Sequence, residues 1–159
     1  MTTPAQATLI SIADAVCAAL QTGCHDGAFS QEFTPGVLFN TELKIEASER
    51  AQVGVVPGRV AKALLDRGSR EGDYTVDIAV RRIINPSDDE NIKSLFLLQE
   101  EIEDYLFHLA EDEGRRLPAF PDALWASADL KWPYVPELLR SHNQFTGICW
   151  VTYHVFDLT

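Results

Sequence analysis

The sequence lacks the short motifs that carry most catalysis and nucleotide binding. It has no G-x-S-x-G turn for a nucleophilic serine and no G-x-G-x-x-G or G-K-[ST] loop for a phosphate. Its four histidines are scattered and show no spacing that would place two metal ligands on one helical face. We therefore expect no enzymatic activity, no cofactor and no histidine-based metal site.

Cysteine and long apolar segments are also scarce. The three cysteines show no C-x-x-C spacing, and Cys17 and Cys149 fall in apolar segments, which predicts buried free thiols and a reducing compartment. Cys24 stands beside His25 without the further ligands of a closed zinc site. No apolar run approaches the about 18 residues of a membrane span, and the first residues lack a basic signal sequence. We expect neither secretion nor a membrane partner.

Positive charge is the third shortage. Thirteen Lys and Arg face 24 Asp and Glu, a formal net charge of -11. Such a chain is repelled by a phosphate backbone, so we expect no sequence-specific nucleic-acid partner. The 159 residues are 46% apolar, which is typical of one globular domain spanning residues 1–159.

The clearest local pattern is a strand followed by a long acidic helix. Residues 74–84 alternate apolar and polar side chains, as a half-buried strand does. Asn85-Pro86 ends this strand, and Ser87 precedes Glu90 with the spacing of a capping box. Apolar residues then recur every three or four positions until Gly114, which predicts a helix.

The other segments complete an α+β pattern. Thr3 and Pro4 predict a first helix over about residues 4 to 21, which Gly23 would end. Further strands are predicted at 51–56, 123–132 and 145–158, with an irregular region containing edge strands at 27–48 and one turn of helix near 137–141. We predict an α+β domain, in which a central antiparallel sheet of about four strands carries two helices packed on one face.

A basic connection stands out in this acidic chain. The segment from Arg59 to Gly72 is too long for a tight hairpin turn, and a connection of that length is usually functional or disordered. Its cations are Arg59, Lys62, Arg67 and Arg70. Two interpretations remain open, a solvated flap and an interaction arm.

The last predicted strand is apolar on both faces. Ile148, Trp150 and Phe156 lie opposite the side that Phe145, Cys149 and Tyr153 would bury. Two helices cover only one side of such a sheet. A neighbouring subunit would cover the other side, or residues 28–48 would fold over it.

Carboxylates are frequent, but each group has a plain structural explanation. Acids in the first turn of the long helix complement its dipole, and those along its polar side face solvent. Asp77 and Asp129 lie in strands, where a cross-strand pair with Arg81 or Lys131 is a simpler interpretation than a metal-dependent hydrolase.

The ordered string of elements resembles a known family. Besides the first helix, the resemblance is carried by residues 53–57 (VGVVP), 74–82 (YTVDIAVRR), 95–103 (LFLLQEEIE) and 144–153 (QFTGICWVTY). In order and pattern these segments are similar to small tail-completion proteins of tailed phages, nearest to the tail-terminator group. The resemblance spans most of residues 4–156.

The resemblance implies an α+β protein without catalytic residues. It implies a homo-oligomeric ring, usually a hexamer, that caps the head-proximal end of the tail tube, ends its polymerisation and meets the head connector. The protein would belong to the virion and assemble in the host cytoplasm. We expect the subunit or tube interface to use the four cations together with Ile148, Trp150 and Phe156.

Two other functions remain open at this point. A neck or head-completion protein would dock on the connector instead of the tube. An acidic inhibitor that mimics DNA would use the charged helix to bind a basic partner.

Overall fold

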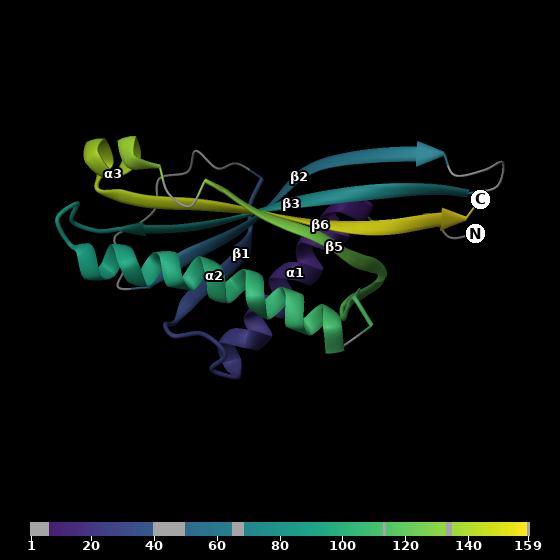
Figure 1. Cartoon of the computed structure of the whole chain (residues 1–159), viewed down its shortest axis with the longest axis horizontal. Helices are drawn as coiled ribbons and strands as arrows, with labels where there is room; N and C mark the ends of the chain where they lie inside the picture. Colours follow the sequence, from purple (N-terminus) through teal and green to yellow (C-terminus); the bar gives the residue numbers. More distant parts are fainter. Residues whose placement is uncertain (1–6, 40–49, 65–68, 113, 133–134, 159) are drawn as a thin grey trace.

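The computed structural model describes residues 7–39, 50–64, 69–112, 114–132 and 135–158. Three helices and six strands follow one another in the order shown in Figure 1. The helices are α1 (Thr8–His25), α2 (Asp89–Asp112) and α3 (Pro136–His142). The strands are β1 (Phe33–Val37), β2 (Ala51–Leu64), β3 (Ser69–Ile83), β4 (Arg116–Leu117), β5 (Phe120–Trp132) and β6 (Gln144–Leu158).

All six strands form one mixed sheet, with the order β1-β2-β3-β6-β5-β4. β1 runs parallel to β2, and every other neighbouring pair is antiparallel. The sheet is strongly curled into a half-barrel, so that α1 contacts β1 and β2 at one side and β5 near the other. The α+β class is confirmed, but the prediction of about four antiparallel strands was wrong.

A single hydrophobic core lies between α1, α2 and one face of the sheet. The alternate residues of β3 and β6 that the sequence predicts to face inward belong to it. Its largest fully buried side chains come from both helices and three strands: Tyr153, Phe145, Ile12, Leu20, Ile78, Leu95, Leu98, Ile102, Leu106, Val16, Val53 and Val55. We call the opposite face of the sheet, which is turned away from α1 and α2, the outer face.

The acidic helix α2 begins one residue later than its predicted capping box. The Asp88 carboxylate, not the Ser87 hydroxyl, accepts the backbone N–H of Asn91 at 3.2 Å. Ser87 instead donates to the side-chain oxygen of Asn85 at 2.8 Å. Aspartate satisfies a free N–H at a helix start as well as serine does, and its charge suits the helix dipole.

The predicted ends of the first helix were wrong. Ala7 is extended, so α1 starts at Thr8; Thr3 lies outside the described residues. Gly23 is buried inside the helix, where a Cβ atom would lie 2.7 Å from the ring of Phe29. The glycine is there because of this close approach, and the chain leaves the helix at Gly27, whose φ is 69°.

The basic connection between β2 and β3 is built mostly of strand, which corrects the prediction of a long loop. β2 continues to Leu64 and β3 begins at Ser69, and the two pair across this whole length. β6 pairs with β3 up to the Ser69–Leu158 step. Residues 58–64, 69–73 and 154–158 thus form a three-stranded extension, which we call the arm. The arm extends to one side beyond the helices (Figure 1).

No helix in the described ranges is both long and apolar enough to cross a membrane.

Candidate functional site

The outer face carries a row of partly exposed apolar side chains on β6. Ile148 and Trp150 are half-buried, and Phe156 is 52% exposed at the arm. On the same strand, Phe145, Cys149 and other inward-facing residues are almost fully buried. β6 therefore keeps a large part of its apolar surface outside the core, as its doubly apolar sequence predicts.

Arg59 and Trp150, two of the predicted interface residues, meet on this face. The guanidinium carbon of Arg59 lies 5.3 Å from the centre of the indole ring of Trp150, within the range of a cation–π contact. The two residues are far apart in the sequence and come from strands on opposite sides of β3. The basic segment and the doubly apolar strand thus form one surface.

A bulge in β2 sets the direction of Arg59. The pairing of β2 with β3 shifts between Pro57 and Arg59, which leaves Gly58 as the extra residue. A Cβ atom on Gly58 would lie 2.7 Å from the backbone oxygen of Thr75. Only glycine allows this close approach without moving the backbone of β3, and the bulge places Arg59 opposite Thr75 on the outer face.

Two carboxylates flank Trp150 in the sheet. Asp77 of β3 and Asp129 of β5 are both its cross-strand partners. Burial raises the pKa of Asp77, and the charge of Arg59 opposes this shift. Arg59, not the expected Arg81, is thus the cation that acts on Asp77. A hollow of about 190 Å³ lies among Gly58, Arg59, Thr75, Asp77 and Trp150.

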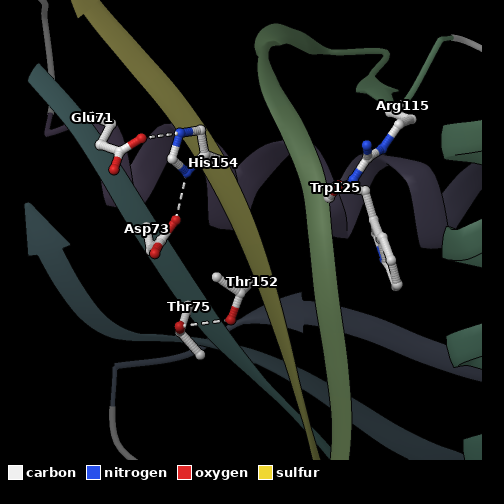
Figure 2. Close-up of polar contacts among 7 residues, drawn as sticks. All are labelled: Glu71, Asp73, Thr75, Arg115, Trp125, Thr152 and His154. Atoms are coloured by element: carbon white, nitrogen blue, oxygen red, sulfur yellow. Dashed lines mark hydrogen bonds and ion pairs between the residues drawn. The ribbon is translucent and has the colours of Figure 1, made fainter. Parts of the chain in front are cut away.

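A polar cluster lies on the outer face of the arm between Trp150 and Phe156. Figure 2 shows the imidazole of His154 between the carboxylates of Glu71 and Asp73. Its Nε2 lies 3.0 Å from Glu71 and its Nδ1 lies 2.6 Å from Asp73. One step further toward the body of the sheet, the hydroxyls of Thr75 and Thr152 are 2.9 Å apart. These contacts join β3 to β6 from the arm to its base.

The predicted interface residues do not all share one face. Arg59, Ile148, Trp150 and Phe156 lie on the outer face. Lys62 pairs with Gly72, next to the Val60–Tyr74 pair, so it lies on the helix-bearing face of the arm. Arg70 is exposed and pairs with Leu64 on that same face. Arg67 lies outside the described residues.

Part of the outer face is covered by the chain itself, as one of the two open interpretations proposed. A Cβ atom on Gly54 would lie 2.6 Å from Cδ1 of Leu38, so this leucine lies over the outer side of β2. Arg81 and Ala79 are buried on this half of the face. Residues 40–49, the rest of the segment in question, lie outside the described part of the chain. On the other half of the face Trp150 is half-buried and Phe156 is 52% exposed.

A second polar hollow, of about 600 Å³, lies between α2, the start of β2 and the segment before β1. It contains Arg82, whose Nη1 donates to the Asn91 side chain at 3.5 Å, and the ion pair of Arg50 with Glu32 at 2.7 Å. Both arginines are thus held by residues of this chain, and in the same lining the Ser30 hydroxyl donates to the Glu101 carboxylate at 2.6 Å.

The three cysteines are free thiols. The thiols of Cys17 and Cys149 are free and buried, as predicted, and burial raises the pKa of Cys149 to about 12. The half-buried Cys24 donates from Sγ to the Phe33 carbonyl at 3.6 Å. Within the described ranges no group of three or more His, Cys, Asp or Glu side chains is placed to hold a metal ion.

The sequence-based site prediction missed His154, Glu71 and Asp73. The signal was the pairing itself, because His154 stands directly opposite Asp73 once β3 and β6 are aligned. Without that register, a histidine and two acids about 80 positions apart carry no visible relation.

Comparison with known proteins identified no relative of this chain. No protein-family model matches the chain, and no curated protein sequence matches it.

Proposed function

We propose that this chain is a structural assembly protein of a tailed phage or prophage, which forms a ring at the head-proximal end of the tail tube. In this proposal the ring stops tube polymerisation and presents a surface to the head connector. The pattern resemblance of the sequence to tail terminators supports it, and a copy number of six follows from the same resemblance. The proposal includes no catalytic step.

One structural observation carries the proposal. The outer face around Trp150 combines half-buried apolar side chains with Arg59 and two carboxylates, and it continues into an arm that extends beyond the helices (Figure 1). Trp and Arg are enriched at the centres of protein interfaces, because they combine a large apolar area with a polar group. A partner that covers this face would bury Ile148, Trp150 and Phe156 and keep Arg59 paired with the indole ring.

The test measures assembly and tube length together. Purified protein is mixed with polymerising tube protein, oligomers are counted by native mass spectrometry, and tube lengths are measured by electron microscopy. A closed oligomer on capped tubes of limited length is the expected result. A protein that stays monomeric in every mixture and leaves tube growth unchanged would refute the proposal, whereas binding to connector protein alone would identify a neck protein.

Trp150→Ala tests which face is used, and Leu97→Ala is its matched control. Leu97 is an exposed apolar residue of α2, 48% accessible, far from the outer face. We expect Trp150→Ala to abolish capping and Leu97→Ala to leave it intact. The reverse result would move the interface to α2.

A further inference from the structure

Exposed apolar side chains are concentrated on the arm. The described part of the chain has five large apolar residues that are exposed, and three of them, Val60, Leu64 and Phe156, belong to the arm. Leu64 is 74% exposed and Phe156 is 52% exposed. Removing such side chains from water is favourable in proportion to the apolar area that a contact buries. The arm therefore offers apolar surface to a partner, although it extends beyond the helices (Figure 1).

These apolar side chains lie on both faces of the arm. Val60 pairs with Tyr74, whose side chain belongs to the core. Lys62 and Leu64 follow Val60 at alternate positions of β2, so all three lie on the helix-bearing face. Phe156 lies on the outer face. A partner that covered one face alone would leave exposed apolar side chains on the other.

The outer face of the arm is acidic. Glu71 and Asp73 lie beside Phe156, with 32% and 53% of their side chains exposed. His154 contacts one oxygen of each carboxylate (Figure 2), and a carboxylate accepts bonds at both of its oxygens. Arg59 shares this face but lies over the indole ring at the base of the arm. The outer surface around Phe156 therefore suits a partner that presents a cation.

The helix-bearing face of the arm presents such a cation. Lys62 is exposed between two apolar side chains of β2 and stands opposite Gly72 in the strand pair. Arg70 stands opposite Asp157 in the pairing of β3 with β6, so Lys62 is the cation of this face that faces no acid within the described strands. One face of the arm thus has a cation flanked by apolar side chains, and the other has an aromatic ring flanked by acids. The two faces are complementary in charge and in apolar character.

One kind of contact satisfies both faces. If two copies met through the same face, like charges would meet and the other face of each arm would stay exposed. A head-to-tail contact instead places the helix-bearing face of one arm on the outer face of the next copy. Every copy then uses both faces, and such a contact closes a ring when the rotation between copies permits it.

We propose that the arm is a head-to-tail contact between copies of this chain. In this contact, Lys62 of one copy meets Glu71 and Asp73 of the next copy. The apolar side chains on either side of Lys62 cover Phe156 of the same neighbour. As the contact that would build the ring, it rests on the proposed function, but the contact itself can be tested by self-association.

Charge reversal on each face tests the contact. Self-association of Lys62→Glu and Asp73→Lys chains is measured by sedimentation equilibrium and native mass spectrometry, with and without tube protein. We expect each reversal to raise the dissociation constant by about ten-fold or more, because it sets like charges together at every contact. Lys93→Glu is the matched control, since it changes the net charge equally at a side chain of α2 that is 75% exposed. This variant should associate as the wild type does.

Restoring opposite charges should restore the contact. A chain that carries both Lys62→Glu and Asp73→Lys has opposite charges at each head-to-tail contact, and an equimolar mixture of the two single variants has them wherever the two chains alternate. We expect both samples to recover association, which also shows that the variants are folded. Recovery in neither sample would overturn the contact. So would a Lys62→Glu chain that associates as tightly as the wild type.

These outcomes distinguish the contact from the proposed function. If tubes are capped by rings that neither charge reversal weakens, the contact is wrong and the ring stands. If copies associate with the expected charge pattern but leave tube growth unchanged, the capping function is wrong and the contact stands. A wild-type protein that stays monomeric with and without tube protein would overturn both.

Discussion

The two faces of β6 are made of similar residues and have different surroundings. On the helix-bearing face, Phe145 and Tyr153 have almost no exposed surface, and Phe145 packs edge-on against Phe96 with 5.7 Å between centroids. On the outer face, Trp150 is half-buried under Arg59 and Phe156 is largely open. One strand thus stabilises the fold with one face and keeps apolar surface available with the other.

The largest expected effect comes from truncating an aromatic residue on each face. Phe145→Ala should lower the free energy of unfolding by about 3–5 kcal/mol, because it leaves a cavity in a packed core. Trp150→Ala should lower it by only about 1–2 kcal/mol, since part of the indole is already in water. Urea unfolding of both variants measures the difference. Equal losses would show that the two faces serve the fold alike.

The second largest loss of stability is expected at the bulge that directs Arg59. Gly58→Ala places a Cβ atom against the Thr75 carbonyl, and we expect a loss of about 1–3 kcal/mol from the strained backbone. Gly36→Ala is the matched control, because a Cβ atom there meets nothing within 4 Å. Thermal melts of the two variants should differ clearly. Equal melting temperatures would mean that the bulge relaxes without cost.

A third prediction uses the thiol on the inner face. Burial raises the pKa of Cys149 from 9.0 to about 12, so between these values the unfolded chain loses a proton that the folded chain keeps. Stability should therefore fall as the pH rises above 9, by up to about 1.4 kcal/mol for each pH unit from this group. Urea unfolding at pH 8 and pH 10 measures the loss, and Cys149→Ala should reduce it. An unchanged pH dependence in that variant would show that the thiol is accessible.

The smallest expected effect belongs to the hydroxyl pair on the outer face. Thr152→Val leaves the buried hydroxyl of Thr75 without its 2.9 Å partner and should cost about 0.5–1.5 kcal/mol. The double variant with Thr75→Val should cost less than the sum of the single variants. Strict additivity in this cycle would mean that the two hydroxyls do not interact.

The sequence predicted the packed body of the molecule better than the arm. Residues 74–84 alternate apolar and polar side chains because one face is buried, and the apolar spacing of α2 is equally plain. In the arm, Lys62 and its neighbours are exposed on both faces of the sheet, so no apolar period marks a strand. Because the arm is exposed on both faces, its sequence lacks the alternation of apolar and polar residues that would have identified it as strand.

Long-range pairing accounts for the other misses. β1 is an edge strand within the region where edge strands were expected, but its parallel pairing with β2 was not predicted, because Pro35 and Gly36 disfavour a strand in isolation. The contact of Arg59 with Trp150 and the position of His154 follow from register, which hydrophobic pattern alone does not provide. The sequence identified the candidate interface residues by their basic or apolar character. Their division between the two faces of the sheet became visible only in the structure.

The short length of β1 has one more consequence, for solubility. β1 pairs with β2 only from Ala51 to Val55, so in the described part of the chain the rest of β2 is an edge. Such an edge invites other strands to add and start aggregation. Pro57, the bulge at Gly58 and the charge of Lys62 each make that addition harder. These features protect the unpaired part of β2 against the addition of another strand.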